Sequence, residues 1–494
     1  MAQAENLYRL LLESDPRDAN ARHLLGLAAF DRKDFDGAER SIREALDLAP
    51  DTPDFLNSLA SVLSETARPA EAADALRRAL QVAPDHELAG SNLLFLLNLL
   101  PGVDGQSMLA EHRRWARLHL PATAPLFRPE NHLPKARPLR VGYLSGDLRA
   151  HPVGRILAEV LPRHDRTRFH VTCYSNRESN DAVAAAIRSG VGAWRDIQTL
   201  SDAEAADLIV RDGIDILVDL SGHTRGNRLR VLAARPAPVV ATWLGYLNTV
   251  GADHADWRIT SPLADPPAAA TWHSERLWYL DDGLWPWRLA EDGSYPQPGA
   301  PPHAARGAVT FGSFNGFRKI NPEVLSAWAA VLKAVPGSRM RIHGVPTGES
   351  VERVCDAFEA EGVPAERLDL FGKLPYEQYL AAYAQVDVML DTFPYSGGAT
   401  ACEALWMGVP VVALAGAGGF ARTSACLLLS LGLDELVAQD ARQYLDKAVA
   451  LAGDLERLSR YRAQLRHRIA RAPASDPERF VRGLERAYEG MWKD

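Results

Sequence analysis

The sequence predicts an arm of α-helical repeats followed by two Rossmann-like α/β domains. Three prolines, Pro16, Pro50 and Pro84, each lie 34 residues from the next, which is a period of helical repeat proteins. From residue 139 onward, short apolar runs alternate with helical stretches, a pattern typical of parallel sheets. A segment rich in Pro, Gly and Ala at 294–307 divides these runs into two sets. A chain of 494 residues, 47% of them apolar, can supply a core to each domain.

Residues 1–120 are expected to form the repeat arm and a connecting helix. The 34-residue period is that of tetratricopeptide repeats, in which small side chains let two antiparallel helices approach closely. The small residues at matching positions are Gly26, Ala38 and Ala45 in one unit and Ala60, Ala72 and Ala79 in the next. The pattern predicts two full repeats and two fragments. Such an arm either braces the rest of the chain or binds a polypeptide on its concave face.

Two α/β domains are expected after the arm. We place a linker at 121–138, a first domain at 139–293, a second linker at 294–307, a second domain at 308–475, and a helix that crosses back to the first sheet at 476–494. The strands predicted for the first domain are 139–144, 170–174, 214–220, 239–244 and 277–280, and those for the second are 309–314, 340–343, 368–371, 386–390 and 409–414. In open parallel sheets, ligands bind at the carboxyl ends of the strands.

Charge and cysteine content exclude several classes of protein. The formal net charge of −8 gives no basic footprint for the phosphates of a nucleic acid. The four cysteines form no C-x-x-C pair, so neither a disulfide framework nor a structural zinc site is indicated. No stretch of about 18 apolar residues occurs, which is the length that a membrane span needs. We therefore expect a cytoplasmic protein with no nucleic acid or membrane partner.

A strand-turn-helix segment in the second domain gives the clearest indication of a binding site. The sequence predicts a buried strand that ends at Asp391, a glycine-containing turn, and a helix that begins near Ala399. The N–H groups and the positive dipole at the start of a helix form a site for a pyrophosphate. We expect Gly398, Ala399 and Thr400 to contact it. The Glu403 carboxylate, one turn into the helix, can accept hydrogen bonds from ribose hydroxyls.

Lys319 is a candidate for charge stabilisation in the same domain. It follows the strand predicted at 309–314, where a cation can neutralise the charge that builds up on a departing nucleoside diphosphate. Gly316 lies three residues before it in the same loop. Tyr376 and Tyr379 precede the strand predicted at 386–390 and are expected near the nucleotide base.

Three polar side chains lie at strand ends of the first domain. His151 follows the strand predicted at 139–144, Asp219 closes the apolar run at 214–220, and His223 follows it. Each alone is consistent with a structural histidine or a turn-forming aspartate. Because the carboxyl ends of parallel strands meet at one edge of a sheet, we expect these three groups to face the same crevice.

Six strings of residues resemble those of the O-GlcNAc transferase and SPINDLY family. They are Gly-His-Thr (222–224), Arg-Pro-Ala-Pro (235–238), Trp-Leu-Gly-Tyr (243–246), Phe-Gly-Ser-Phe-Asn (311–315), Leu-Asp-Thr-Phe-Pro-Tyr (390–395) and Cys-Glu-Ala-Leu-Trp-Met-Gly-Val-Pro (402–410). The similarity extends from the repeats to Trp492. It implies a GT-B glycosyltransferase fold and an inverting transfer of a sugar from a nucleotide-sugar to Ser or Thr hydroxyls of proteins.

The resemblance also assigns roles to individual residues. It matches His151 to an active-site histidine, Lys319 to a diphosphate-binding lysine, Thr400 to a phosphate-contacting threonine, Glu403 to the ribose-binding acid, and Asp219 with His223 to a polar pair that lines the cleft. No metal or other cofactor is expected. From Arg140 onward the sequence has no Asp-x-Asp, and the helix start together with Lys319 would replace a cation.

The identity of the sugar donor stays open between two branches of the family. O-GlcNAc transferase has Gln where this chain has Gly316, a His-Thr pair where it has Gly398 and Ala399, and Asp where it has Glu403. The glutamate is shared with SPINDLY, which uses GDP-fucose. We favour a UDP-sugar, UDP-GlcNAc first, because a short repeat arm without an intervening domain resembles O-GlcNAc transferase homologues.

Parts of the sequence also suggest two other classes of function. A nicotinamide-binding site could use the glycines from Gly416 to Gly419, but Ala421 occupies the place of the third glycine in that fingerprint. The chain could also be a binding module, in which the repeats dock a partner and the α/β domains form a degenerate transferase. Binding of a nucleoside diphosphate would discriminate a transferase from such an adaptor.

Overall fold

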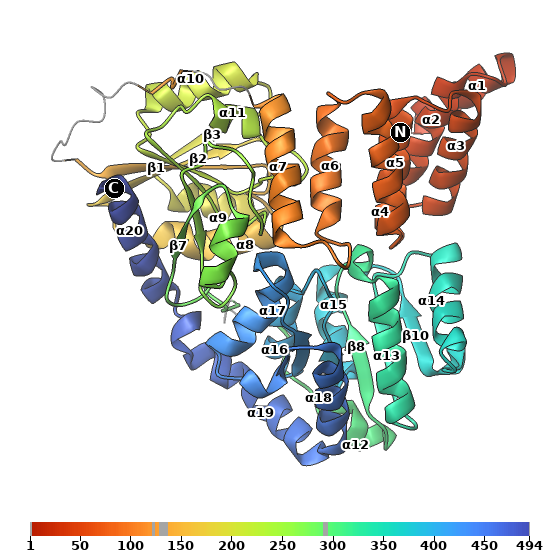
Figure 1. Ribbon diagram of the computed structural model, residues 1–494. Coiled ribbons are helices and arrows are strands. Elements are labelled where there is room, and N and C mark those ends of the chain that lie inside the picture. The colour runs from red at the N-terminus through yellow and green to blue at the C-terminus, as the bar shows by residue number, and fades with distance from the viewer. Residues whose placement is uncertain (1, 121–123, 128–136, 290–294, 494) are drawn as a thin grey trace. The chain divides into compact units, whose positions relative to one another are not determined.

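The computed structural model describes residues 2–120, 124–127, 137–289 and 295–493 (Figure 1). Residues 121–123, 128–136 and 294 of the expected linkers, and residues 290–293 of the expected first domain, lie outside the described residues. The chain forms two compact units. The first unit comprises residues 1–102, 289–416 and 434–466, and the second comprises residues 103–288, 417–433 and 467–494. The domain boundaries drawn from the sequence stay a prediction.

The repeat arm is part of the first unit. Its helices are α1 (Ala2–Ser14), α2 (Ala19–Asp31), α3 (Phe35–Leu48), α4 (Pro53–Glu65), α5 (Pro69–Val82) and α6 (Glu87–Leu97). A Cβ atom at Gly26 would lie 2.6 Å from Ile42 Cγ1, so α2 and α3 pack too closely there for any side chain. Ala38 and Ala72 are fully buried at the matching places of α3 and α5. The two predicted repeats, α2 with α3 and α4 with α5, are therefore confirmed.

The sheet of the first unit is parallel. In the described part of the chain its strands follow the order β10-β9-β8-β11-β12-β13. Their bounds are β8 (Thr310–Ser313), β9 (Arg339–His343), β10 (Leu368–Phe371), β11 (Val388–Leu390), β12 (Val411–Leu414) and β13 (Val437–Ala438). The first five match the apolar runs found in the sequence. The edge strand β13 has two residues, which is too short to leave a periodic pattern.

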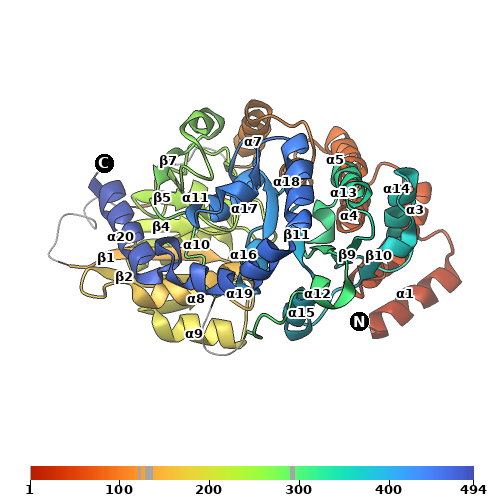
Figure 2. The same cartoon turned by 90° about the horizontal axis from the view of Figure 1, so that it is seen from below.

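Helices surround this sheet. They are α12 (Pro302–Arg306), α13 (Pro322–Ala334), α14 (Glu349–Ala360), α15 (Tyr376–Ala382), α16 (Ala399–Trp406), α18 (Ala441–Gly453) and α19 (Leu455–Arg471). The first turns of α14 lie against the repeat arm (Figures 1 and 2). The Glu349 N–H donates to Asp36 Oδ2 at 3.1 Å, and Arg353 Nη2 donates to the Thr66 carbonyl at 2.9 Å. The arm is thus hydrogen-bonded to the sheet domain of its own unit.

The sheet of the second unit is also parallel. Within the described residues its strand order is β3-β2-β1-β4-β5-β6-β7. The strands are β1 (Leu139–Ser145), β2 (Phe169–Ser175), β3 (Ala193–Asp196), β4 (Ile216–Asp219), β5 (Val239–Thr242), β6 (Trp257–Thr260) and β7 (Arg276–Tyr279). The order turns around at β1 and β4, whose carboxyl ends are adjacent because Leu144 pairs with Asp219. Such a turning point is where ligands bind in sheets of this kind.

Two strands of this sheet were absent from the sequence prediction. The edge strand β3 has no buried residue, so it leaves no apolar run. In strand β6 the apolar run is interrupted by Arg258, which is 1% exposed. Its guanidinium donates to the carboxylate of Asp265 at 3.3 Å and to the backbone carbonyls of Tyr246 and Asn248. A buried, paired arginine of this kind breaks the hydrophobic pattern without breaking the strand.

The helices of the second unit cover both faces of its sheet. They are α7 (Gly105–His119), α8 (Pro152–Val160), α9 (Ala182–Gly190), α10 (Asp202–Asp212), α11 (Leu229–Ala233), α17 (Gly419–Ser430) and α20 (Pro477–Lys493). Helices α8 and α9 lie on one face and α10 and α11 on the other (Figure 1), as right-handed crossovers require. The last helix, α20, packs beside α8 (Figure 2). Its Tyr488 hydroxyl lies 2.7 Å from that of Tyr143 in β1.

Candidate functional site

The loop after β11 folds around the carboxylate of Asp391. This side chain is fully buried at the end of the strand, and its Oδ1 accepts hydrogen bonds from Gly397 N at 2.8 Å and Asn315 Nδ2 at 3.0 Å. A Cβ atom at Gly397 would lie 2.8 Å from that oxygen, so the loop needs glycine there. The Asp391 carbonyl accepts from the buried Tyr444 hydroxyl at 2.8 Å. These bonds fix the loop that leads into α16.

Thr400 is connected to the same carboxylate. Its hydroxyl donates to Asn315 Oδ1 at 2.7 Å, and the Asn315 amide donates in turn to Asp391. The N-cap of α16 is Gly398, which has no side chain that could cap the first turn. Backbone N–H groups at a helix start have no intrahelical acceptor. The first turn of α16 therefore presents backbone donors while the Thr400 hydroxyl proton is held by Asn315.

Lys319 lies at this loop, as the sequence predicted. It ends the short 3-10 helix η4 (Phe317–Lys319) that follows β8, and its Nζ donates to the Ser396 carbonyl at 2.8 Å. The same Nζ lies 4.3 Å from the centroid of the Tyr395 ring. Burial lowers the pKa of Lys319 to about 8, while the nearby Asp391 carboxylate opposes this shift. The structure thus gathers Lys319, Thr400 and Asp391 at the carboxyl ends of β8 and β11.

Glu403 is held by two tyrosines. Its carboxylate is 6% exposed and accepts from Tyr376 Oη at 2.9 Å and from Tyr379 Oη at 2.7 Å. Tyr383, which the sequence reasoning missed, lies 2.8 Å from the Tyr379 hydroxyl and donates to the Thr400 carbonyl at 3.1 Å. Its spacing of four residues from Tyr379 was the available signal. One hydrogen-bonded network thus joins Glu403, the tyrosines and the first turn of α16.

The glycine at 316 faces open space. A Cβ atom there would meet no atom within 4 Å. Gly316 lies directly before η4, and Gly398 directly before α16, so two positions beside Lys319 and Thr400 carry no side chain. This arrangement leaves room for a ligand next to the cation and the helix start.

His151 lies in the second unit as the N-cap of α8. The N–H of Val153 donates to its Nδ1 at 3.3 Å, and Asp147 Oδ2 lies 3.7 Å from the same nitrogen. The imidazole is 36% exposed. When a neutral imidazole accepts at Nδ1, its proton is on Nε2. A proton on Nδ1 would instead point toward Asp147 and leave the Nε2 lone pair available.

Asp219 and His223 were expected to face a crevice, and both side chains are almost fully buried. Asp219 is 1% exposed, and burial raises the pKa of its carboxyl to about 6, although its Oδ2 accepts from Gly222 N at 2.7 Å. His223 is 2% exposed, with its ring centroid 4.6 Å from that of Trp115 and 5.2 Å from that of His112. Burial lowers the pKa of His223 well below 6.5, which keeps it neutral. Their catalytic roles stay a prediction.

The glycines considered for a dinucleotide have a different environment. The N–H of Gly419, at the start of α17, donates to the buried Asp265 Oδ1 at 2.8 Å. A carboxylate thus occupies the place where a dinucleotide phosphate would need to bind. This observation removes the support for a nicotinamide-binding site.

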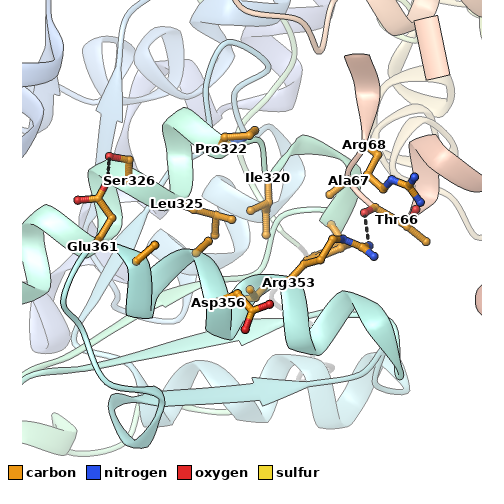
Figure 3. Close-up of a pocket in the computed structure, with 14 residues that line it drawn as sticks. Thr66, Ala67, Arg68, Ile320, Pro322, Leu325, Ser326, Arg353, Asp356 and Glu361 are labelled. Atoms are coloured by element: carbon orange, nitrogen blue, oxygen red, sulfur yellow. Dashed lines mark hydrogen bonds between the residues drawn. The ribbon is translucent and has the colours of Figure 1, made fainter. Parts of the chain in front are cut away.

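A separate cavity of about 540 Å³ lies in the first unit (Figure 3). It is bordered by the turn between α4 and α5 on one side and by α13 and α14 on the other, and Phe317 and Ile320 contribute to its wall. Its charged side chains are largely paired, since Arg68 donates to Glu39 and Glu361 accepts from Ser326. None of the site residues predicted from the sequence lines this cavity.

The described residues contain no group of three or more His, Cys, Asp or Glu side chains that could hold a metal ion. Among the same residues, no helix is both long and apolar enough to cross a membrane.

Comparisons with known proteins identify the family. The sequence profile of Glycosyl transferase family 41 matches residues 113–285 and 302–484, and a tetratricopeptide repeat profile matches residues 2–53 and 23–87. The chain belongs to glycosyl transferase family 41. The predicted resemblance and the predicted repeats are thereby confirmed.

Individual relatives agree with this family. The "Probable UDP-N-acetylglucosamine--peptide N-acetylglucosaminyltransferase SPINDLY" of Oryza sativa subsp. japonica is 37% identical over 426 residues, which are 85% of this chain and 46% of the relative. The protein of the same name in Solanum lycopersicum is 36% identical over 84% of this chain and 45% of its own length. The chain thus spans about half the length of the curated relatives it matches.

A solved structure resembles almost the whole chain. It is a lysine-to-methionine mutant of Thermobaculum terrenum O-GlcNAc transferase, 38% identical, with a TM-score of 0.92 over 99% of this chain and 94% of that one. The predicted fold class, tetratricopeptide helices followed by a GT-B fold of two Rossmann-like domains, is confirmed.

Proposed function

We propose that the chain is a cytoplasmic, inverting and metal-independent protein O-glycosyltransferase that moves GlcNAc from UDP-GlcNAc to Ser or Thr hydroxyls of proteins. The observation that carries the proposal is the buried network at the carboxyl ends of β8 and β11, where Lys319 and the start of α16 share one loop. Membership of family 41 and the names of the relatives support the reaction class and the UDP-linked donor.

In the proposed reaction, the acceptor oxygen forms a bond to the anomeric carbon while the bond from that carbon to the diphosphate oxygen breaks. The leaving nucleoside diphosphate takes the electron pair. Lys319 and the N–H groups of the first turn of α16 stabilise its charge, and Glu403 accepts hydrogen bonds from the ribose hydroxyls. The acceptor proton goes to Nε2 of His151, or through water to Asp219.

Proton transfer from the acceptor to His151 requires one particular tautomer of its imidazole. Nε2 of the neutral imidazole can accept a proton only when Nδ1 carries one, and Asp147 Oδ2 lies 3.7 Å from Nδ1. Closure of that gap in the substrate complex would orient the imidazole for catalysis. Catalytic hydrogen bonds are often long before the substrate is bound.

A GDP-fucose donor is the second candidate. It is favoured by the glutamate at 403 and by the open space at Gly316, both of which depart from the O-GlcNAc transferase pattern. A transfer assay with UDP-GlcNAc and GDP-fucose on serine-containing peptides tests both donors together. Transfer from UDP-GlcNAc supports the first proposal, transfer from GDP-fucose replaces it by the second, and transfer from neither favours the adaptor.

Glu403→Gln is expected to weaken nucleoside diphosphate binding about tenfold. The amide keeps the shape of the side chain but cannot accept paired hydrogen bonds as an anion, and bonds to a charged group contribute about 1.5–3 kcal/mol. Calorimetric titration measures the loss. Glu377→Gln, on the exposed face of α15, is the matched control and should bind as the wild type does. Equal affinities for all three proteins would remove Glu403 from the site.

Metal independence is expected to appear as full activity in EDTA. Lys319 and the α16 dipole are proposed to supply the positive charge that a divalent cation supplies elsewhere. The measurement is the initial transfer rate with and without chelator. Loss of transfer in EDTA that magnesium or manganese restores would overturn this part of the mechanism.

A further inference from the structure

An aromatic contact joins the repeat arm to the loop that carries Lys319. Phe95 lies on α6, the last helix of the arm, and its ring centroid is 6.3 Å from that of Tyr395, with an angle of 39° between the rings. Tyr395 belongs to the loop between β11 and α16, and its ring lies under the Lys319 ammonium. The arm therefore reaches Lys319 through one intervening side chain.

The neighbouring cation contacts the same helix directly. The guanidinium carbon of Arg318 lies 4.8 Å from the Phe95 ring centroid, and Arg318 Nη1 lies 3.8 Å from Glu65 Oε1 at the end of α4. Both cations of η4 are thus connected to the arm, Arg318 by direct contact and Lys319 through Tyr395. The rings of Phe95 and Tyr395 attract these cations and so help to fix their positions.

The residues on either side of the two cations border a cavity. Phe317 and Ile320, which flank the two cations in sequence, line the 540 Å³ cavity between the α4–α5 turn and α13 (Figure 3). Phe317 and Ile320 are themselves buried, and the contact of Arg318 with Phe95 adds a further restraint on η4.

We propose that the repeat arm positions Lys319 through Phe95 and Tyr395, so that the arm is part of the donor site and not only a docking surface for polypeptides. The proposal rests on the proposed function, in which Lys319 binds the diphosphate. It makes Phe95 and Tyr395 positioning residues rather than catalytic ones. It also gives the short arm a role that needs no acceptor protein.

Loss of the Phe95 ring has two predicted consequences. Tyr395 and Arg318 lose their support, so the ammonium of Lys319 is held less firmly. Water also gains access to Lys319, whose charged neighbours are Asp391 and Arg318. Since burial is the main cause of its lowered pKa, hydration should move that pKa upward, toward the value of an exposed lysine.

The experiment uses the full chain with Phe95→Ala and, as a milder change, Phe95→Leu. Phe30→Ala is the matched control, because Phe30 is a half-buried aromatic residue of the arm whose ring partner, Phe35, also lies in the arm. The chain has only seven lysines, so 13C-dimethylation and NMR can follow each ammonium through a pH titration. The Lys319 signal is assigned as the one that Lys319→Arg removes.

Phe95→Ala is expected to raise the pKa of Lys319 through hydration, and to weaken UDP or GDP binding about threefold to tenfold because Tyr395 and Arg318, which has its cation–π contact with Phe95, no longer hold η4 as firmly. Phe95→Leu should show a smaller change in the same direction, and Phe30→Ala should change neither quantity even if it lowers the melting temperature. An unchanged Lys319 pKa in both Phe95 variants overturns the proposal, as does an equal change in Phe30→Ala. If the wild type binds neither nucleotide, the proposed function fails, while the pKa comparison still decides whether the arm sets the environment of Lys319.

Discussion

Lys319→Ala is expected to lower the transfer rate by about 10²–10³ while the protein stays folded. The ammonium is held at the α16 loop by the Ser396 carbonyl before any ligand arrives, so it needs little reorganisation when charge develops on the leaving diphosphate. Removing one preorganised group of this kind costs about 2.7–4 kcal/mol of transition-state stabilisation. Steady-state kinetics with saturating donor measures the effect.

The pKa of Lys319 predicts how the transfer reaction depends on pH at the alkaline side. The pKa of Lys319 is about 8, so the ammonium is present below that pH and is lost as pH rises through it. We expect kcat/KM for the donor, which reports the free enzyme, to fall above about pH 8. Lys333→Ala, an exposed lysine of α13 that pairs with Glu361, is the control and should keep both the rate and the profile. A Lys319→Ala enzyme with near wild-type turnover would remove Lys319 from the mechanism.

His151→Ala is expected to lower the transfer rate by about 10²–10⁴ and to leave nucleoside diphosphate affinity within about twofold, because general base catalysis acts on the acceptor proton and not on the donor. Measuring the transfer rate together with calorimetric affinity separates the two effects. His170→Ala, which removes an exposed histidine of β2, serves as control.

The outcome also distinguishes the two routes for the proton. A rate that falls by less than tenfold in His151→Ala, with a large loss in Asp219→Asn, would favour the water-mediated route to Asp219. Loss of nucleotide affinity in His151→Ala would instead place the imidazole against the donor and contradict its assignment to the acceptor side.

Much of the fold could be predicted because its signals are local. The 34-residue spacing of prolines and the small residues at Gly26, Ala38 and Ala72 depend only on helix packing within each repeat. The central strands are continuous apolar runs because both faces of a parallel sheet are buried. Strands β3, β6 and β13 lack such a run. Strand β3 is an edge strand with no buried residue, Arg258 interrupts the apolar residues of β6, and β13 has only two residues.

The candidate site was predicted only in part, because several of its contacts join distant segments. Lys319 follows a predicted strand, and Thr400 and Glu403 lie near the start of a predicted helix, so local sequence patterns identify all three as candidates. The link from Asn315 to Asp391 arises only when β8 pairs with β11, which no local pattern encodes. The burial of His223 among Trp115, His112 and Tyr246 depends on where α7 packs, so sequence alone could not reveal that it is neutral and enclosed.

The central claim is that the loop between β11 and α16, together with Lys319 and Glu403, binds the diphosphate and ribose of a nucleotide-sugar. Calorimetric titration of the intact protein with UDP and with GDP, repeated with Lys319→Ala, tests it most directly. We predict that UDP binds more tightly than GDP and that Lys319→Ala loses most of this affinity. Preference for GDP would transfer the assignment to a SPINDLY-like O-fucosyltransferase, and binding of neither nucleotide by the wild type would contradict the claim.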